Sequence, residues 1–289
     1  MIQIYLIHFL FCRQFRRRFR VPYDVFEILL GFSKEWFPTW NEKGANGKLP
    51  HPLELKVLGC LRVLGHGATF DNVAELNHIS EPTNRVFFHS WCDKVVNNLG
   101  PTYIRVPEGD EEIEGISSTY AKSGFPGCLG SVDCVHIRWD NCPAKWRHLY
   151  KGKNPHPTIS YEVTVDHNRR ILFVTLGDCG TRNDKTIVRF DGFVQKFHSD
   201  GFYDDIAFDL FKADGTTKTI HGSYLICDGG YHKWRCLQCG FSQPLGQSDV
   251  EYSDHIASIR KDVECCFGIL KIRFRILRHP IIFKKKCDI

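Results

Sequence analysis

Three acidic residues stand at positions where a carboxylate needs an explanation. Asp133 lies within the apolar run GSVDCVHIRW, Asp228 follows the run SYLIC, and Glu264 borders the apolar stripe of SIRKDVECCFGILKIRF. A carboxylate at a buried or half-buried position is costly unless its charge is compensated. Taken singly, each has a structural explanation: Asp133 could cap a loop, Asp228 could serve a turn, and Glu264 could pair with Arg260 one helical turn earlier.

Taken together, the three acids predict a cation site. If the first and fourth strands of a sheet are neighbours, Asp133 and Asp228 lie side by side, and a helix packed across the sheet can bring Glu264 over them. Two bare carboxylates about 4 Å apart repel by roughly 4 kcal/mol at an effective dielectric near 20, so the cluster requires cations. Carboxylate oxygens suit Mg²⁺ or Mn²⁺, and two such ions can clamp the attacking and leaving oxygens of a phosphodiester displacement. Gly268, one turn after Glu264, leaves the helix surface bare for a bulky substrate.

The elements that must position these acids are predicted from the residue pattern. GCLGSVDCVHIRW is a strand, TISYEVTVDHNRRILFVTLGD is a hairpin, NDKTIVRFDGFVQKFHSD is a helix that opens on Asn183 or Asp184, and SYLICDGG is a buried strand. The helix that carries Glu264 follows. This order predicts an α/β architecture in which a mixed sheet is flanked by helices.

The first part of the chain is predicted to be helical. Residues 53–99 divide into a helix closed by Gly65 and Gly67, a short helix entered at Thr69, and a longer helix after Ser80. A short helix, a tight turn and a longer helix form a helix-turn-helix-like unit, although helical pairs without a DNA role are at least as common. The acidic segment 108–115 is predicted to be a linker. The predicted domains are therefore 1–115, with the helix-turn-helix-like unit at 53–99, and 116–289.

Charge and composition describe a globular protein with local basic blocks. The chain has 289 residues, 43% hydrophobic content and a net charge of +5. The block RQFRRRFR, which contains Arg16, Arg17 and Arg18, and the basic line through Arg260 and Lys271 could contact phosphates, but a solvated helix face explains each as well. The apolar start of the chain is too short to span a bilayer, and its positive charges follow the apolar run, so neither a membrane span nor a signal peptide is predicted. Thirteen scattered cysteines indicate reduced thiols in a nuclear or cytoplasmic protein.

Four motifs, in order, carry a resemblance to a known family. GSVDCVHIRW, TISYEVTVDHNRRILFVTLGDCGTRNDKTI, ICDGGYHKW and RKDVECCFGILKIRFRIL resemble the successive motifs of PIF/Harbinger-type transposases, within the DDE superfamily of endonucleases. The resemblance runs from about Gly127 to Arg278 and extends more loosely to the helical N-terminal region. It implies an RNase H-like catalytic domain, with the catalytic and metal-binding triad on Asp133, Asp228 and Glu264.

The resemblance also implies secondary site residues and a mechanism. The family's Asn-Asp pair falls on Asn183-Asp184, which makes Asp184 a secondary candidate, and His136 is a second one as a possible phosphate contact. Asp178 competes with Asp228 for the second triad position, but the DGGY context favours Asp228. The implied reaction is two-metal cleavage and joining of DNA at transposon terminal inverted repeats, with one ion on Asp133 and Asp228 and the other on Asp133 and Glu264.

The resemblance further implies partners, a compartment and one departure. A Myb-like/SANT accessory protein would help with DNA binding and nuclear entry, and coordinated cutting of two ends favours a homo-oligomer. The chain stops at FKKKCDI, where family members usually continue, which favours a truncated or misjoined gene model. Two alternatives stay open: a domesticated DNA-binding protein that has lost nuclease activity, and an RNase H-like nuclease that acts on other nucleic acids.

Overall fold

The structure is a computed structural model that describes residues 2–41, 49–212 and 214–283. The chain forms two compact units. Unit 1 contains the described residues up to Pro101 together with the segment Leu270–Pro280. Unit 2 contains Thr102–Ile269 and the described residues from Ile281 onward.

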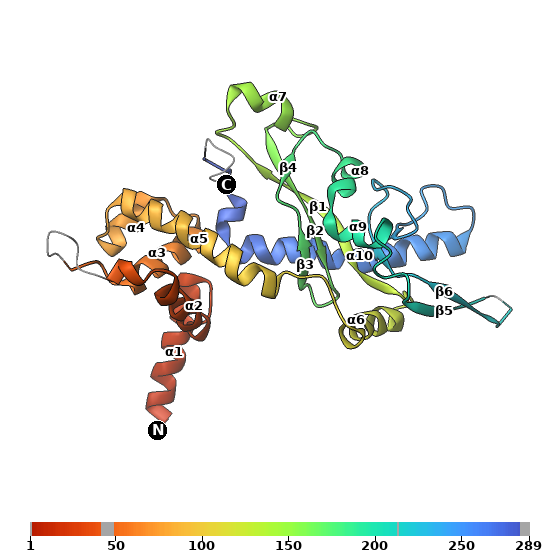
Figure 1. Cartoon of the computed structure of the whole chain (residues 1–289), viewed down its shortest axis with the longest axis horizontal. Helices are drawn as coiled ribbons and strands as arrows, with labels where there is room; N and C mark the ends of the chain where they lie inside the picture. The colour runs from red at the N-terminus through yellow and green to blue at the C-terminus, as the bar shows by residue number, and fades with distance from the viewer. Residues whose placement is uncertain (1, 42–48, 213, 284–289) are drawn as a thin grey trace. The chain divides into compact units, whose positions relative to one another are not determined.

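Unit 1 is helical (Figure 1). Its elements are α1 (Ile2–Phe19), α2 (Tyr23–Trp36), the 3₁₀ turn η1 (Pro38–Asn41), α3 (Leu53–His66), α4 (Phe70–Asn77), α5 (Glu81–Tyr103) and η4 (Arg275–Arg278). The predicted capping residues explain two of the boundaries. Gly67 ends α3 in the left-handed conformation with φ 65°, and the Thr69 hydroxyl begins α4 by accepting a hydrogen bond from the Asn72 amide at 3.2 Å. A helix-turn-helix role for this succession of helices stays a prediction.

The core of unit 1 joins α2, α3 and α5. Phe87 and Trp91 are buried on α5, and the Trp91 indole donates a hydrogen bond of 2.9 Å to the buried Ser33 hydroxyl of α2. Farther along α5, Val95 and Leu99 are only partly buried. This face of α5 is therefore buried near the start of the helix and becomes more exposed toward its end.

Unit 2 is built on a mixed sheet, which confirms the α/β prediction. The strand order is β3 (Ile171–Val174), β2 (Thr158–Val165), β1 (Cys128–Arg138), β7 (Tyr224–Ile226) and β8 (Leu237–Gln238), and β4 (Asp178–Cys179) pairs with β2. The pairs β1–β2 and β2–β3 are antiparallel, whereas β1–β7 and β7–β8 are parallel. The predicted hairpin and the predicted contact between the first strand and the SYLIC strand are both present.

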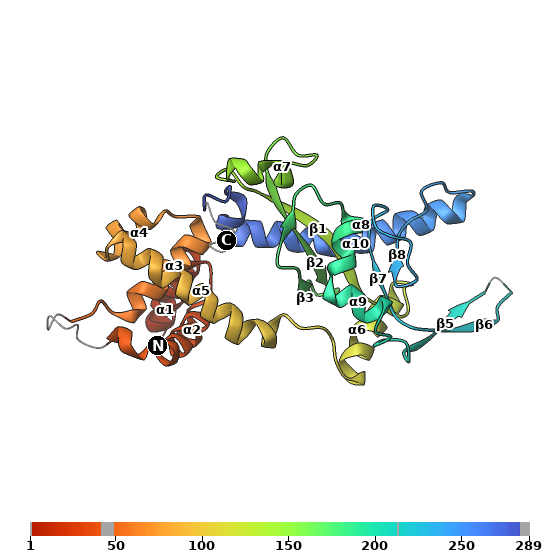
Figure 2. The same cartoon turned by 45° about the horizontal axis from the view of Figure 1, so that its top comes forward.

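Helices cover the sheet on both sides (Figures 1 and 2). The long helix α10 (Gln247–Arg273) runs along one side, and α8 (Asp184–Ile187) and α9 (Gly192–His198) lie on the other. The helix predicted to open at Asn183 or Asp184 is broken, because the Asp191 side chain caps α9 by accepting hydrogen bonds of 2.8 Å from the amides of Phe193 and Val194. The elements η2 (Ala144–Trp146), α7 (Arg147–Tyr150) and η3 (Val188–Phe190) complete the connections.

Two segments differ from the prediction. Residues 108–115 do not form a linker, because most of them belong to helix α6 (Asp110–Lys122). Three acids in its first turn suit the positive end of the helix dipole, and Glu112 forms ion pairs of 2.7 Å with Arg105 and Arg170. The segment before β7, for which the sequence pattern predicts no strand, contains the hairpin of β5 (Ala207–Phe211) and β6 (Thr217–His221), whose residues are mostly exposed. Among the described residues, no helix is long and apolar enough to cross a membrane.

Truncating a core residue of the sheet should destabilise unit 2. Leu172 on β3 is 0% exposed, so Leu172→Ala should lower the free energy of unfolding by about 2–5 kcal/mol through lost contacts and the cavity left behind. Leu176, which is 99% exposed, provides the control, and Leu176→Ala should change it by less than about 0.5 kcal/mol. Urea unfolding of the full chain measures both, and equal effects would contradict the sheet packing described above.

Candidate active site

Asp133 lies in the central strand β1. Its side chain is 19% exposed, between the fully buried Val132 and the partly buried Cys134. One carboxylate oxygen, Oδ1, accepts a hydrogen bond of 2.8 Å from the Cys134 amide, and Oδ2 accepts one of 3.1 Å from Arg260. The strand thus holds the carboxylate in a largely dry position where both oxygens have donors.

Asp228 comes beside Asp133 through the parallel pairing of β1 and β7. Ser131 is the register partner of Ile226, so two residues farther along each chain the same register brings Asp133 level with Asp228. Asp228 lies just past the end of β7, and its Oδ1 accepts a hydrogen bond of 2.7 Å from the Gly230 amide. The tight turn therefore fixes one oxygen of Asp228 at the end of the strand.

Glu264 projects from α10 and shares Arg260 with Asp133. The Arg260 guanidinium contacts Glu264 Oε1 at 2.8 Å and Asp133 Oδ2 at 3.1 Å, so one cation bridges the two acids. The Glu264 side chain is 47% exposed, whereas the neighbouring Val263 is fully buried. Successive helix residues point in directions about 100° apart, so Val263 faces the interior while the Glu264 carboxylate lies at the solvent-exposed border of the helix.

The pKa of Asp133 reports the proximity of all three acids. Burial raises this pKa above its ordinary value, and the negative charges of Asp228 and Glu264 raise it further. The Cys134 amide and the Arg260 guanidinium act in the opposite direction. The charge of Asp133 is thus stabilised by the Cys134 amide and the Arg260 guanidinium.

The donor chemistry fits a divalent cation, but the placement of the donors requires a rearrangement. Among residues 2–41, 49–212 and 214–283, no group of three acidic, histidine or cysteine side chains converges closely enough to hold a metal ion. Arg260 contacts two of the three candidate ligands, so a metal that binds both Asp133 and Glu264 must displace its guanidinium. Hard carboxylate oxygens are the ligands that Mg²⁺ and Mn²⁺ prefer.

Gly230 leaves space at the edge of this site. A Cβ atom at position 230 would lie 2.8 Å from Asp228 Oδ1 and 3.2 Å from Asp184 Oδ2, so a side chain there would crowd both carboxylates. Burial raises the pKa of Asp184, and the charge of Asp228 adds to the effect. The glycine therefore keeps two neighbouring acids accessible, as a cation-binding edge requires.

Sequence comparisons address the origin of this arrangement. The profile of the family described as "Plant transposon protein" matches residues 101–289. The chain belongs to the plant transposon protein family. A relative, "Protein ALP1-like" from Arabidopsis thaliana, is 22% identical over 271 residues, which cover 92% of this chain and 64% of the relative. These matches confirm the relationship to Harbinger-type transposases. No solved structure matches the chain.

The chain covers less than two thirds of the length of this relative, so activity does not pass from one to the other through the match alone. All three acids of the predicted triad nevertheless fall within the part of the chain that matches the transposon protein family. The roles of these residues stay predictions.

The secondary candidates lie around the triad without joining it. His136 is on β1, three residues beyond Asp133, and alternate residues of a strand face opposite sides of a sheet, so the two side chains diverge. Its Nδ1 lies 2.9 Å from the Thr158 hydroxyl. Asp184 begins α8, directly after Asn183, whose side chain caps this helix by accepting a hydrogen bond of 2.9 Å from the Thr186 amide. The competing residue Asp178 forms an ion pair with Arg182.

The predicted DNA contacts are dispersed. Arg16, Arg17 and Arg18 are exposed in the last turn of α1, and Lys271 is half-buried in the last turn of α10, within the part that belongs to unit 1. Arg260 pairs with Asp133 and Glu264, which includes the Glu264 pairing that the sequence left open as a structural explanation.

Sequence reasoning missed a second group of buried acids. Glu162 on β2 is 0% exposed, and both of its carboxylate oxygens lack a hydrogen-bond partner of standard geometry among the described residues. Burial, reinforced by the nearby charge of Asp191, raises the pKa of Glu162 to about 10. Glu162 is therefore protonated and neutral at pH 7. Glu162 is the only charged residue type in the strand sequence TISYEVTV of β2, and a charged residue within a predicted strand is the same signal that drew attention to Asp133.

This protonation state predicts a specific dependence of stability on pH. Unfolding returns Glu162 to its ordinary pKa of about 4.3, so the folded state binds one more proton than the unfolded state between that pH and about 10. The free energy of unfolding of the wild type, relative to that of Glu162→Gln, should fall by up to about 1.4 kcal/mol per pH unit between pH 6 and 9.

Urea unfolding at several pH values measures this difference. Glu114 is exposed on α6, so Glu114→Gln should keep the pH dependence of the wild type. Parallel pH curves for Glu162→Gln and the wild type would show that Glu162 is ionised in the fold.

Proposed function

We propose that unit 2 is an RNase H-like, metal-dependent endonuclease domain that cleaves and joins DNA, with a triad formed by Asp133, Asp228 and Glu264. The observation that carries the proposal is the electrostatic coupling of these acids. A carboxylate held in a central strand is affected by one at the end of the adjacent parallel strand and by one on the helix packed across the sheet. Membership of the plant transposon protein family supports DNA as the substrate class.

The three acids of the triad would be the metal ligands. Asp133 and Asp228 would hold one Mg²⁺ or Mn²⁺ ion, and Asp133 and Glu264 would hold the other. Such a cation supplies Lewis-acid stabilisation of the negative charge that develops on the phosphate oxygens. Two glycines keep the approach to the acids clear. A Cβ at Gly230 would crowd two carboxylates, and the position of a Cβ at Gly268 is open space.

Arg260 has two states in this proposal. In the ligand-free fold it neutralises Asp133 and Glu264, which would otherwise repel each other in a partly dry site. If these acids held a divalent cation instead, the Arg260 guanidinium would be free to contact a DNA phosphate, which is the role predicted for Arg260 from the sequence.

The cleavage test compares two glutamates on the same helix. Glu264→Gln should lower the rate of Mn²⁺-dependent cleavage of plasmid DNA carrying the gene's flanking repeats by at least about 100-fold, because even indirect supports of metal ligands are worth about 10–100-fold. Glu251→Gln, at an exposed position of α10, should leave the rate unchanged. Gel electrophoresis of plasmid topoisomers measures both rates.

Three outcomes of this test would contradict the proposal. They are absence of cleavage by the wild type with either metal, equal cleavage by the wild type and Glu264→Gln, and preferential cleavage of RNA or of RNA–DNA hybrids. The last outcome would favour an RNase H-like nuclease with another substrate.

Metal binding gives a second test that does not depend on turnover. Arg260→Gln should raise the affinity for Mn²⁺ by about tenfold, since it removes a cation that competes for two of the ligands. Lys261→Gln removes an adjacent, exposed charge from the same helix and should have a much smaller effect. Isothermal titration calorimetry at pH 8 measures the affinities, and a lower affinity in Arg260→Gln would contradict the competition.

A second candidate function is a domesticated DNA-binding protein without nuclease activity. It is favoured by one observation: Arg260 satisfies two of the acids while no three of the described acidic, histidine or cysteine side chains form a metal site. Absence of Mn²⁺ binding by the wild type, together with retained DNA binding, would support it.

Partners and compartment belong to the same proposal. Transposon terminal inverted repeats would be the DNA substrate, and cutting two ends together would require a homo-oligomer. A Myb-like/SANT protein would assist DNA binding and entry into the nucleus, where the substrate lies.

A further inference from the structure

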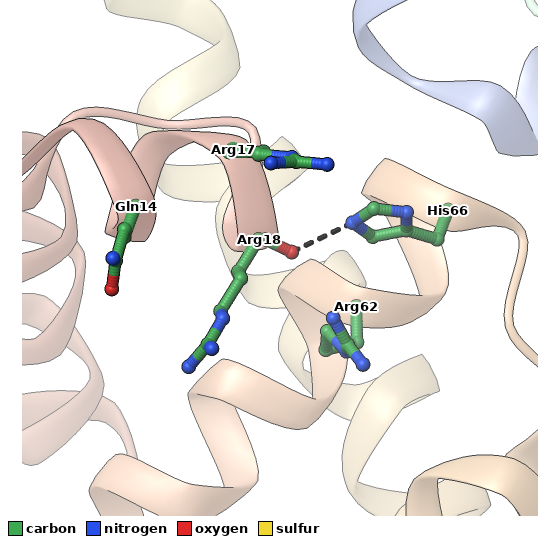
Figure 3. A pocket seen from close by; sticks show the side chains of 5 residues that line it. All are labelled: Gln14, Arg17, Arg18, Arg62 and His66. Carbon is green, nitrogen blue, oxygen red and sulfur yellow. Dashed lines mark hydrogen bonds between the residues drawn. The ribbon is translucent and has the colours of Figure 1, made fainter.

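Unit 1 contains a cavity of about 420 Å³ between two helices (Figure 3). Gln14, Arg17 and Arg18 line it from α1, and Arg62 and His66 line it from α3. We call this cavity the α1–α3 pocket. All of its lining residues belong to the same compact unit, and Gln14 and the three arginines offer nitrogens that can donate hydrogen bonds to a ligand.

The pocket carries uncompensated positive charge. Within the described part of the chain, no acidic side chain forms an ion pair with Arg17, Arg18 or Arg62, whereas Arg260 and Arg105 each pair with a carboxylate. An arginine cluster without acids is a binding site for anions, because guanidinium groups match phosphate oxygens in charge and in hydrogen-bond geometry.

Other cations add to the field of the pocket. Burial lowers the pKa of His66; a hydrogen bond to Arg18 raises it, and the positive charges of Arg20, Arg62 and Arg275 lower it further. The Nε atom of Arg20 is buried and lacks a hydrogen-bond partner among the described residues. Several positive charges from separate elements of unit 1 therefore act on the same small region.

The wall of the pocket is fixed by its own hydrogen bonds. His66 Nε2 lies 2.8 Å from the Arg18 carbonyl oxygen, and because a carbonyl only accepts, the imidazole nitrogen donates (Figure 3). This bond ties the end of α1 to the end of α3, so the arginines on both helices keep a defined spacing.

We propose that the α1–α3 pocket binds the phosphate backbone of duplex DNA. The choice of DNA among phosphate sources rests on the proposed function, since an endonuclease needs backbone contacts outside its cutting site to hold the duplex. Contacts with phosphates alone give binding that is independent of sequence and strongly dependent on salt. The pocket would thus position the duplex without selecting a sequence.

The test measures the salt dependence of DNA binding in EDTA by fluorescence anisotropy. Each neutralised phosphate contributes about 0.9 to the slope of log K against log salt. The double variant Arg17→Gln/Arg62→Gln should therefore lose about 1.8 from the slope and bind a 20-base-pair duplex about 60-fold more weakly at 100 mM salt, with equal losses for two unrelated sequences.

A charge-matched control separates the pocket from general electrostatics. Lys94→Gln/Lys122→Gln removes two exposed positive charges elsewhere and should leave the slope within about 0.5 of the wild type. Equal losses in the two double variants would overturn the proposal. The conservative variant Arg17→Lys/Arg62→Lys should retain most of the slope, which excludes misfolding as the cause of a loss.

Two further arms identify the phosphate source. Inorganic phosphate at 10 mM, with ionic strength held constant, should not displace the duplex; displacement would show a site for a free anion and overturn the assignment to DNA. Tighter binding of duplex RNA than of duplex DNA would also overturn it.

The failure of this proposal can be told apart from failure of the proposed function. Binding in EDTA does not involve the metal, and cleavage by Glu264→Gln does not test the pocket. An unchanged slope in the pocket variant with metal-dependent cleavage intact would reject the pocket alone, whereas a reduced slope without any cleavage by the wild type would reject the endonuclease alone.

Discussion

Arg260 joins two carboxylates that come from different elements of the fold, Asp133 on β1 and Glu264 on α10. The constraint behind this contact is that a carboxylate in a largely dry strand requires a nearby positive charge. Because α10 supplies that charge, its position along the sheet matters for electrostatics as well as for packing. A second ion pair, between Arg169 of the β2–β3 turn and Asp262 at 3.5 Å, links the same helix to the hairpin.

The strand order gives the candidate site its other half. A crossover places β7 next to β1 in parallel, with Ser131 opposite Ile226. Two residues farther along each strand direction, Asp133 and Asp228 therefore come level with each other. Asp133 stays within its strand at that level, whereas Asp228 has already left β7 and entered a glycine turn. One acid is thus held by a strand of the sheet and the other by a short turn after a strand.

The sequence predicted the elements of unit 2 better than the contacts among their side chains. Alternation and turn residues identified β1, the β2–β3 hairpin and β7, because these strands bury one or both faces. The sequence pattern does not predict the β5–β6 hairpin, because its exposed residues lack an apolar face. The acidic start of α6 resembles a linker in composition, but acids also suit the first turn of a helix.

Side-chain contacts were harder to predict for a physical reason. Arg260 lies four residues before Glu264, so the pair was one option that helical spacing offered, but its second contact crosses 127 positions of sequence. The burial of Glu162 likewise depends on what α9 and the turn after β7 place against the sheet. Such long-range contacts are set by packing, which local patterns do not encode.

Unit 1 is assembled from two separated parts of the chain. His279 packs so closely against Gly67 that a Cβ at position 67 would lie 2.3 Å from the imidazole ring. The positive charge of Arg275 contributes to lowering the pKa of His66. The ribosome makes the chain from its amino terminus, so α1 to α5 emerge first, and Thr102–Ile269 of unit 2 must be made before Leu270–Pro280 can dock. The last packing step of unit 1 therefore follows synthesis of the whole sheet. In an incomplete chain that lacks Leu270–Pro280, the helical surface against which this segment packs would be left exposed.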